Sequence, residues 1–298
     1  MSRFSICNFT LFTTPIDKQV DAVAASGATG MGVAEALLGE RPDIAALRRR
    51  LDAEGLRATI CLPALLSPLP LVLFPGPEEP AERVRGLKES VRLLAQLGPE
   101  SIAILTGPRQ GLDAAEAREI AVDGLAQVNE VAKSEGVRLA LEPIHRDDHE
   151  SWSLVWNIPD ALTLLDAIGD DNIGLLVDSF HLADTDPEIH DRLRAAGPRI
   201  AAVHVSDRAV DGRSWADRRV PGSGATDLAP WVAACEAAGY RGHYDCEIFS
   251  DDGSLGVADY PDSLWKQDPH DVARACAEGF ARAAEGLLTP VGGQSNKQ

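Results

Sequence analysis

Short apolar runs alternate with longer amphipathic segments along nearly the whole chain. The short runs have the length of buried strands, and the longer segments repeat their apolar residues with the period of a helix. Strands are predicted at residues 4–10, 30–36, 57–62, 101–105, 137–141, 173–177, 200–205 and 243–249. Helices are predicted at residues 15–26, 42–54, 81–97, 114–134, 158–168, 188–196, 228–238 and 271–287. This alternation is typical of a parallel sheet covered by helices.

Eight strands, each followed by a helical segment, predict a (β/α)8 TIM barrel in a single domain over residues 1–288. The chain of 298 residues has a suitable length for this fold. A doubly wound open sheet is the alternative, but no Gly-x-Gly-x-x-Gly follows the first strand and no Walker sequence occurs. Residues 289–298 are polar and glycine-rich, and we expect them to form a disordered tail.

Two connections are longer than a barrel needs. Residues 63–80 form a loop rich in Pro and Leu, which could be a lid or rim of the active site or could only fill space. Residues 251–265 carry the aromatic side chains of Tyr260 and Trp265, which could cover the pocket or contact another subunit. The sequence leaves these alternatives open.

Composition and charge exclude several classes of protein. No apolar run approaches the roughly 20 residues that span a bilayer, so a membrane protein is not expected. The five cysteines are scattered without a Cys-x-x-Cys pair, which favours a reducing cytoplasm over a disulfide framework. A formal net charge of −18 would repel a phosphate backbone, so nucleic acid is not the expected ligand. Assembly into a homo-oligomer stays open.

The last four predicted strands carry side chains that bind metals. The fifth strand runs directly into Glu142 and the sixth into Asp178, while His204 lies in the seventh and Glu247 in the eighth. The active site of a (β/α)8 barrel lies at the carboxyl ends of its strands. Because strands five to eight are neighbours in such a barrel, these four side chains are predicted to converge on one point.

Three carboxylates and one imidazole form an oxygen-rich ligand set with one nitrogen. Such a set suits Mn²⁺, Mg²⁺ or Co²⁺ better than a thiolate zinc centre does. Taken singly, an acid at a strand end is explained by a helix cap, and a strand histidine by a hydrogen bond in the core. Four together are harder to explain in this way, because uncompensated acids crowded into a barrel mouth repel one another. The sequence therefore predicts one divalent metal ion.

The motifs around these residues resemble the xylose isomerase-like TIM barrel superfamily, the sugar phosphate isomerase/epimerase group also called AP endonuclease family 2. The resemblance covers nearly the whole chain. It rests on Leu-Glu142-Pro, Val-Asp178-Ser-Phe-His181, Val-His204-Val-Ser-Asp, Arg219-Val-Pro-Gly-Ser-Gly224 and Cys-Glu247-Ile.

The resemblance implies a role for each matched residue. In ketohexose 3-epimerases of this group the matching Glu, Asp, His and Glu hold one Mn²⁺ or Co²⁺, and the two glutamates move the proton. Glu142 and Glu247 are therefore expected to act as acid and base as well as metal ligands. His181 and Arg219 are expected to contact the substrate, and Mn²⁺ is the first expectation for the metal.

Other charged residues compete for contact with the substrate. The segment between His204 and Arg219 is longer than the epimerase pattern, so Arg208 and Arg218 are alternatives to Arg219. His145, which follows Glu142 in a charged segment, is also a candidate contact.

The expected activity is that of a sugar isomerase or epimerase, which would remove a proton next to a carbonyl and pass through an enediolate. The substrate would be a keto-sugar or cyclitol, and the Gly222-Ser223-Gly224 segment leaves open whether it is phosphorylated. A metal-dependent lyase or dehydratase is the alternative, because the same enolate can expel a leaving group. A non-catalytic partner subunit and an AP endonuclease are further alternatives.

Overall fold

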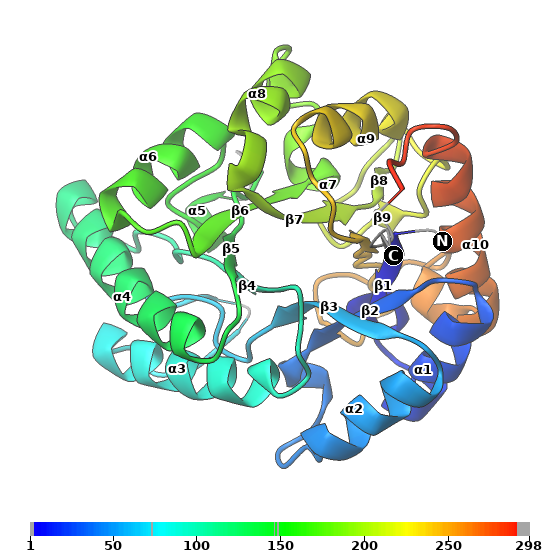
Figure 1. The fold of residues 1–298 in the computed structure, drawn as a ribbon, viewed down its shortest axis with the longest axis horizontal. Coiled ribbons are helices and arrows are strands. Elements are labelled where there is room, and N and C mark those ends of the chain that lie inside the picture. Colours follow the sequence, from blue (N-terminus) through cyan, green and yellow to red (C-terminus); the bar gives the residue numbers. More distant parts are fainter. Residues whose placement is uncertain (1–2, 73, 146, 148, 291–298) are drawn as a thin grey trace, which may run out of the picture.

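The computed structural model describes residues 3–72, 74–145, 147 and 149–290. Parallel strands close into a barrel in the order β1, β10, β7, β6, β5, β4, β3 and β2 (Figure 1). The strands are β1 (Phe4–Cys7), β2 (Gly30–Ala34), β3 (Arg57–Leu62), β4 (Ser101–Ile104), β5 (Leu139–Leu141), β6 (Ile173–Asp178), β7 (Ile200–Val205) and β10 (Tyr244–Cys246). The predicted TIM barrel is confirmed.

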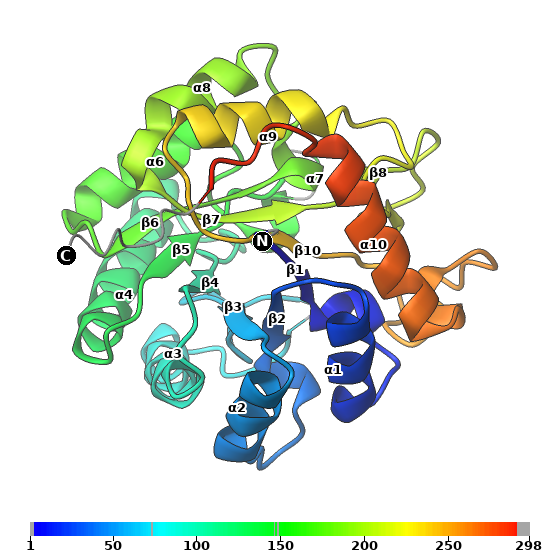
Figure 2. The same ribbon diagram turned by 45° about the vertical axis from the view of Figure 1, so that its right-hand side comes forward.

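Helices surround the barrel as an outer layer, which the turned view also shows (Figure 2). The long ones are α1 (Ile16–Ala25), α2 (Ile44–Ala53), α3 (Pro80–Ala95), α4 (Ala114–Ser134), α6 (Ile158–Ile168), α8 (Ile189–Ala196), α9 (Leu228–Ala237) and α10 (Pro269–Ala283). Within the described residues, no helix combines the length and apolar composition that crossing a membrane requires. Residues 291–298 of the predicted tail lie outside the described residues.

Alternation along the strands divides the buried side chains into two layers. Leu139 and Leu141 of β5 pack in the layer between the barrel and its helices, whereas Ala140 packs in the second cluster, inside the barrel. Leu176 of β6 and Ala202 of β7 belong to the same inner cluster. Even-numbered residues of these strands therefore point inward. The predicted ligands on β6 and β7, Asp178 and His204, are even-numbered and point inward too.

Several element boundaries differ from the sequence prediction. The predicted strand 4–10 ends at Cys7, because a 3-10 helix, η1 (Asn8–Leu11), begins there. The hydroxyl of Thr10 in η1 donates to the carbonyl of Cys246 and accepts from the N–H of Ile248, which ties this turn to the end of β10. These side-chain bonds satisfy backbone groups that a longer strand would have paired.

Two short elements on the site face were not predicted. A hairpin of β8 (Asp207–Arg208) and β9 (Arg218–Arg219) follows β7. A single helical turn, α7 (Ser179–Leu182), follows β6 directly. Elements of two to four residues are too short to produce a periodic pattern in a sequence.

The long loops predicted at the rim are packed rather than open. In the first, Leu66 and Leu69 are buried, and the loop pairs its backbone with residues 105 and 106. In the second, the carboxylate of Asp251 accepts hydrogen bonds from four backbone N–H groups between residues 253 and 258. The indole ring of Trp265 stacks on Phe12 at 4.5 Å.

Candidate metal centre

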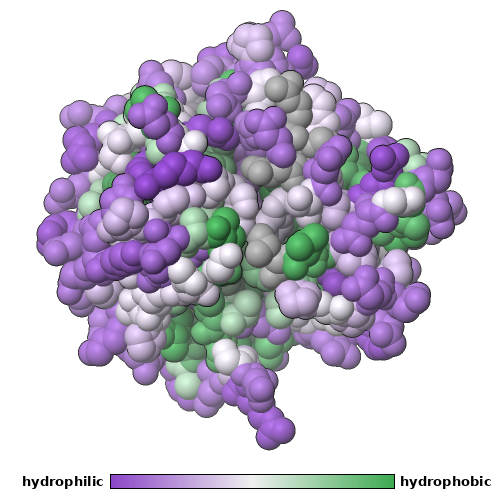
Figure 3. All heavy atoms as spheres, turned by 180° about the vertical axis from the view of Figure 1, so that it is seen from behind, coloured by the Kyte–Doolittle hydropathy of each residue, from purple (hydrophilic) through white to green (hydrophobic). Residues whose placement is uncertain are grey.

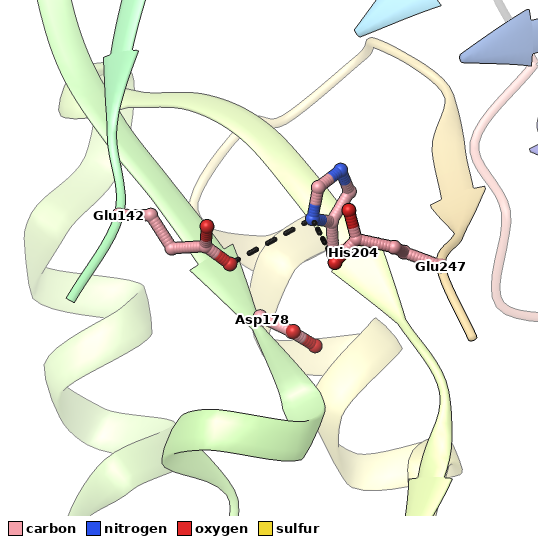
Figure 4. A group of neighbouring side chains, drawn as sticks. All are labelled: Glu142, Asp178, His204 and Glu247. Atoms are coloured by element: carbon pink, nitrogen blue, oxygen red, sulfur yellow. Dashed lines mark ion pairs between the residues drawn. The ribbon is translucent and has the colours of Figure 1, made fainter. Parts of the chain in front are cut away.

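The four predicted ligands come together at the carboxyl ends of neighbouring strands. Asp178 ends β6 and is paired in register with His204 of β7, while Glu142 and Glu247 directly follow β5 and β10. Each offers one ligand atom, and these atoms all lie within 4.8 Å of one another. Figure 4 shows the side chains pointing toward a common centre from four separate segments. The predicted convergence is confirmed as geometry.

The cluster is buried, and burial dominates its electrostatics. His204 Nδ1 lies 3.7 Å from Glu142 Oε1 and 3.5 Å from Glu247 Oε2. Burial raises the pKa of Glu142 to about 7, and burial also raises the pKa of Asp178. Burial alone would lower the pKa of His204, but the carboxylates of Glu247 and Glu142 outweigh it and raise that pKa to about 10. The carboxylates thus strongly favour a positive charge at the centre of the cluster.

The donor set fits a divalent cation. Among the described residues, Glu142 Oε1 and His204 Nδ1 are buried atoms without a hydrogen-bond partner, and both face the centre of the cluster. Buried polar atoms without partners are uncommon in folded proteins. Three carboxylates and an imidazole supply the oxygen-rich set that Mn²⁺, Mg²⁺ or Co²⁺ prefers. The cluster therefore has the composition and the unsatisfied atoms of a metal site.

Beneath the four candidate ligands lies a carboxylate that was not predicted from the sequence. Asp245 of β10 is fully buried, and its Oδ2 lies 3.7 Å from His204 Nε2, the nitrogen directed away from the cluster centre. Both atoms lack a hydrogen-bond partner among the described residues. Thr59 donates to the other oxygen of Asp245 at 3.4 Å. A Cβ on Gly32 of β2 would lie only 2.2 Å from Asp245 Oδ2, so this strand leaves room for the carboxylate.

An arginine from the hairpin reaches the cluster, and it is Arg218. Its Nη1 lies 3.1 Å from both Asp178 Oδ2 and Glu247 Oε2, and the guanidinium lies over the rings of Phe180 and Phe249. Neighbouring residues of a strand point to opposite sides. This alternation means that only one of Arg218 and Arg219 can face the cluster, and it was the signal in the sequence that could have distinguished them.

The Arg219 side chain points away from the cluster. Its guanidinium pairs with Asp217 at 3.0 Å and with Asp262 at 3.1 Å, and this network joins the hairpin to the loop after β10. The prediction that Arg219 contacts substrate stays a prediction.

His181 lies beside the cluster, on the helical turn α7 that follows β6. Asp178 accepts a hydrogen bond from the N–H of Phe180 and caps α7, so the chain turns into a helix at this point. His181 Nε2 lies 3.8 Å from Asp178 Oδ2 and 3.3 Å from Arg218 Nη2. Burial, reinforced by the charge of Arg218, holds the pKa of His181 well below its usual range, so the ring is neutral.

The other two candidate contacts lie in a neighbouring polar cavity. His145 and Arg208 line it together with Asp184. His145 Nε2 is 3.6 Å from Asp184 Oδ1, and Arg208 Nε is 3.5 Å from Asp184 Oδ2. The backbone N–H of His145 donates to His181 Nδ1 at 3.2 Å, which links this cavity to the cluster. The structure therefore brings His145 and Arg208 near the site without directing their side chains at its centre.

A pocket opens directly over the cluster. Among the described residues, the polar ones that line this pocket are Glu142, Glu247, His181 and Arg218. Its other lining residues are apolar or aromatic and come from β3, β4 and the segments that follow the strands on this face of the barrel.

A family model for xylose isomerase-like TIM barrels matches residues 20–276. The inosose isomerase of Halalkalibacterium halodurans is 31% identical over 138 residues, which are 45% of this chain and 48% of that protein. The 3-dehydroshikimate dehydratase of Pseudomonas aeruginosa is 30% identical over 145 residues, 47% of this chain and 22% of that protein. The chain thus spans about half or less of the length of these curated relatives.

Similarity of structure extends over the whole barrel. The crystal structure of the IOLI protein with a binding zinc atom has a TM-score of 0.77 with this chain. The match covers 97% of this chain and 100% of the chain in that structure. The two sequences are 18% identical, so this similarity concerns the fold alone.

Proposed function

Because the chain belongs to the family of xylose isomerase-like TIM barrels, we propose that it is a divalent-metal-dependent isomerase or epimerase of a hydroxy-ketone. The observation that carries this proposal is the buried cluster of Glu142, Asp178, His204 and Glu247, whose ligand atoms lie within 4.8 Å of one another. The named activity of the inosose isomerase relative supports it. A keto-sugar or cyclitol, the substrate class expected from the sequence, is the first class to be tested.

Glu142, Asp178, His204 and Glu247 would hold one ion, with Mn²⁺ proposed first and Co²⁺ or Mg²⁺ as alternatives. When bound, such an ion supplies Lewis acidity, which polarises a carbonyl and acidifies the neighbouring C–H bond. The proton transfers themselves are proposed for the protein side chains.

Glu142 and Glu247 are proposed as the acid and base. They follow β5 and β10, with β6 and β7 between them in the barrel, so they approach the cluster from different sides (Figure 4). Epimerisation needs one group to remove a proton from one face of the carbon and another to return it on the opposite face.

Arg218 and His181 are proposed to bind the substrate oxygens at the metal. The guanidinium of Arg218 donates in a fixed geometry, and it lies 3.3 Å from His181, whose pKa is lowered by burial. Arg218 therefore takes the role that the sequence analysis gave to Arg219. The contacts expected of Arg219, His145 and Arg208 remain predictions, since each of these side chains is paired with an aspartate at 3.0–3.6 Å.

A lyase is the second candidate, and the dehydratase relative is the observation that favours it. Its first step would be the same removal of a proton next to a carbonyl. The two candidates differ in product, because elimination leaves a double bond where epimerisation leaves a saturated ketone. Mass spectrometry of the product separates them by the loss of water.

The test of the proposed function is proton exchange in D₂O. The Mn²⁺-loaded protein is incubated with inosose and with ketohexoses, and deuterium next to the carbonyl is followed by NMR. We expect label in the wild-type product, and no net conversion by Glu142→Gln or Glu247→Gln with the fold retained. Glu130→Gln, on the exposed side of α4, is the matched control. Normal conversion by either glutamine variant would contradict the proposed acid and base roles.

A further inference from the structure

Five aromatic side chains form a closed ring of contacts around the pocket. We call this ring the aromatic collar; it consists of Phe9, Phe74, Trp152, Trp215 and Phe249. Their ring centroids are separated by 6.4 Å, 5.8 Å, 5.3 Å and 5.5 Å in that order, and Phe249 returns to Phe9 at 4.8 Å. Each separation lies in the range of edge-to-face or tilted aromatic pairs. The collar is therefore continuous.

The collar is assembled from five separate segments. Phe9 belongs to η1, Phe74 to the loop before α3, Trp152 to α5 (His149–Trp152), Trp215 to the turn between β8 and β9, and Phe249 to the segment after β10. No single amphipathic element explains such an arrangement. Phe74, Trp152 and Trp215 are only half-buried, so they face the pocket rather than fill the core. Figure 3 shows hydrophobic surface near the centre of this face, within a largely hydrophilic rim.

The polar groups of the pocket lie together at one end, where Arg218 also contacts the collar through the ring of Phe249. Glu142 and Glu247 belong to the metal cluster, and Arg218 is hydrogen-bonded to Glu247 and lies 3.3 Å from His181. All four thus lie at one end of the pocket. In the described chain, the remaining lining residues are the collar and a few aliphatic side chains, among them Leu62, Leu66 and Ile144.

This separation determines which part of a substrate can be polar. Two neighbouring oxygens of a hydroxy-ketone would meet the metal ligands and Arg218, but everything beyond them would enter the collar. A free ketohexose carries further hydroxyl groups there, and burying them against aromatic rings without partners is unfavourable. A phosphate would be worse, because its charge would lose water without gaining a cation from the collar.

We propose that the substrate is a hydroxy-ketone whose body beyond the two metal-directed oxygens is an apolar ring, such as an aryl substituent, stacked inside the aromatic collar. The inference rests on the proposed function, because the hydroxy-ketone end is assigned from the metal cluster. It departs from a free ketose or a sugar phosphate in the part that the collar receives.

Three probes with the same polar end test the proposal. Dihydroxyacetone supplies this end alone, D-fructose adds a hydroxylated chain, and 2-hydroxyacetophenone adds an aryl ring. Dissociation constants are measured by calorimetry on the Mn²⁺-loaded protein. Burial of the aryl ring predicts binding at least about tenfold tighter than that of dihydroxyacetone. D-fructose is expected to bind no tighter than dihydroxyacetone, and fructose 6-phosphate no tighter than D-fructose.

Variants show whether the gain comes from the collar. Trp215→Ala and, separately, Trp152→Ala should each remove most of the gain for the aryl probe while leaving the dissociation constant of dihydroxyacetone unchanged. Trp156→Phe changes a tryptophan that does not line this pocket and should keep the gain. Quenching of tryptophan fluorescence by 2-hydroxyacetophenone in chelator-treated protein gives a second readout that does not depend on metal or turnover.

The outcomes distinguish the inference from the proposed function. A gain for D-fructose or its phosphate equal to that of the aryl probe would overturn the inference, and so would an undiminished aryl gain in both tryptophan variants. Absence of deuterium exchange in any ketone would remove the proposed function, whereas the order of binding constants would still test the collar.

Discussion

The two ends of the barrel each hold a buried histidine beside a carboxylate, and the two histidines differ in whether their ring nitrogens have hydrogen-bond partners. At the amino-terminal end, His243 Nδ1 lies 2.6 Å from Glu100 Oε1, and its Nε2 lies 3.1 Å from the hydroxyl of Thr29. At the carboxyl end, neither ring nitrogen of His204 has a hydrogen-bond partner among the described residues. One histidine is satisfied within the fold, and the other is surrounded by acids that do not reach it.

The difference separates structural from functional polar groups. A buried polar atom without a partner costs free energy, so a fold keeps it only where something else compensates. Glu100 and His243 complete each other, since the backbone N–H of His243 also donates to Glu100 Oε2 at 2.9 Å. At the other end, the proposed ligands would find their partner in a bound cation. Chain position alone does not reveal this, because both histidines lie at or near a barrel strand.

Replacing each histidine by alanine should give the largest contrast. His204→Ala removes a proposed ligand, so affinity for Mn²⁺ should fall by more than the roughly 10- to 100-fold that loss of an outer partner costs. His243→Ala should leave that affinity unchanged. Calorimetric titration of the chelator-treated proteins with Mn²⁺ measures both. Equal affinities in the two variants would mean that His204 is not a ligand.

A smaller effect is expected at the carboxylate behind His204. Asp245→Asn keeps the size of the side chain but weakens its attraction for the N–H of His204 Nε2, so the imidazole loses a partner that would orient it. We expect affinity for metal to fall about tenfold. The absorption spectrum of the Co²⁺ form should change with it, because the ligand geometry changes. An unaltered spectrum together with wild-type affinity would assign Asp245 to packing alone.

The amino-terminal pair should affect stability and not the metal. Glu100→Gln removes the charge that faces His243, and we expect a loss of about 1 kcal/mol in the free energy of unfolding, because the pair is partly exposed. Urea denaturation of the wild type and the variant measures the loss. Metal affinity should stay at the wild-type value, and a drop in it would show that the two ends are coupled.

The smallest effect is the pH dependence of this pair. Burial by itself raises the pKa of Glu100, but the hydrogen bonds and charge of His243 outweigh it and hold the pKa below its ordinary value of 4.5. A carboxylate with a lowered pKa contributes stability above its unfolded pKa and loses it as pH falls through the folded pKa. The stability difference between wild type and Glu100→Gln should therefore be present above the ordinary glutamate pKa of 4.5 and decrease as pH falls below it. A difference that persists unchanged at pH 3 would contradict this account.

The fold was predictable because the barrel repeats one simple pattern. The helix at 114–134 and the strands at 57–62 and 200–205 were predicted with the boundaries that the structure has. The predicted strand boundaries are wrong where hydrogen bonds from side chains take the place of pairing between strand backbones. The strand predicted at 243–249 is shortened to Tyr244–Cys246, because the segment after it bonds to η1 and the hairpin instead.

The site was predictable to the extent that it follows strand ends. Glu142, Asp178, His204 and Glu247 were found because each lies at a fixed place in the repeating pattern. Arg218 was ranked below Arg219 because the hairpin that orients it has only two residues in each strand. Similarly, the collar joins residues as distant as Phe9 and Phe249, and no local pattern connects them.

Gly32 lies on a strand that supplies none of the proposed ligands, yet any side chain there would collide with the carboxylate of Asp245 behind His204. The strand can therefore tolerate almost no variation at this position, whatever its own role in the sheet. In a library of all single substitutions, residue 32 should behave like a ligand, with every replacement inactive while neighbouring exposed positions accept most residues. A genetic screen for lost activity would thus find this glycine among the proposed metal ligands, although β2 lies across the barrel from β6 and Asp178.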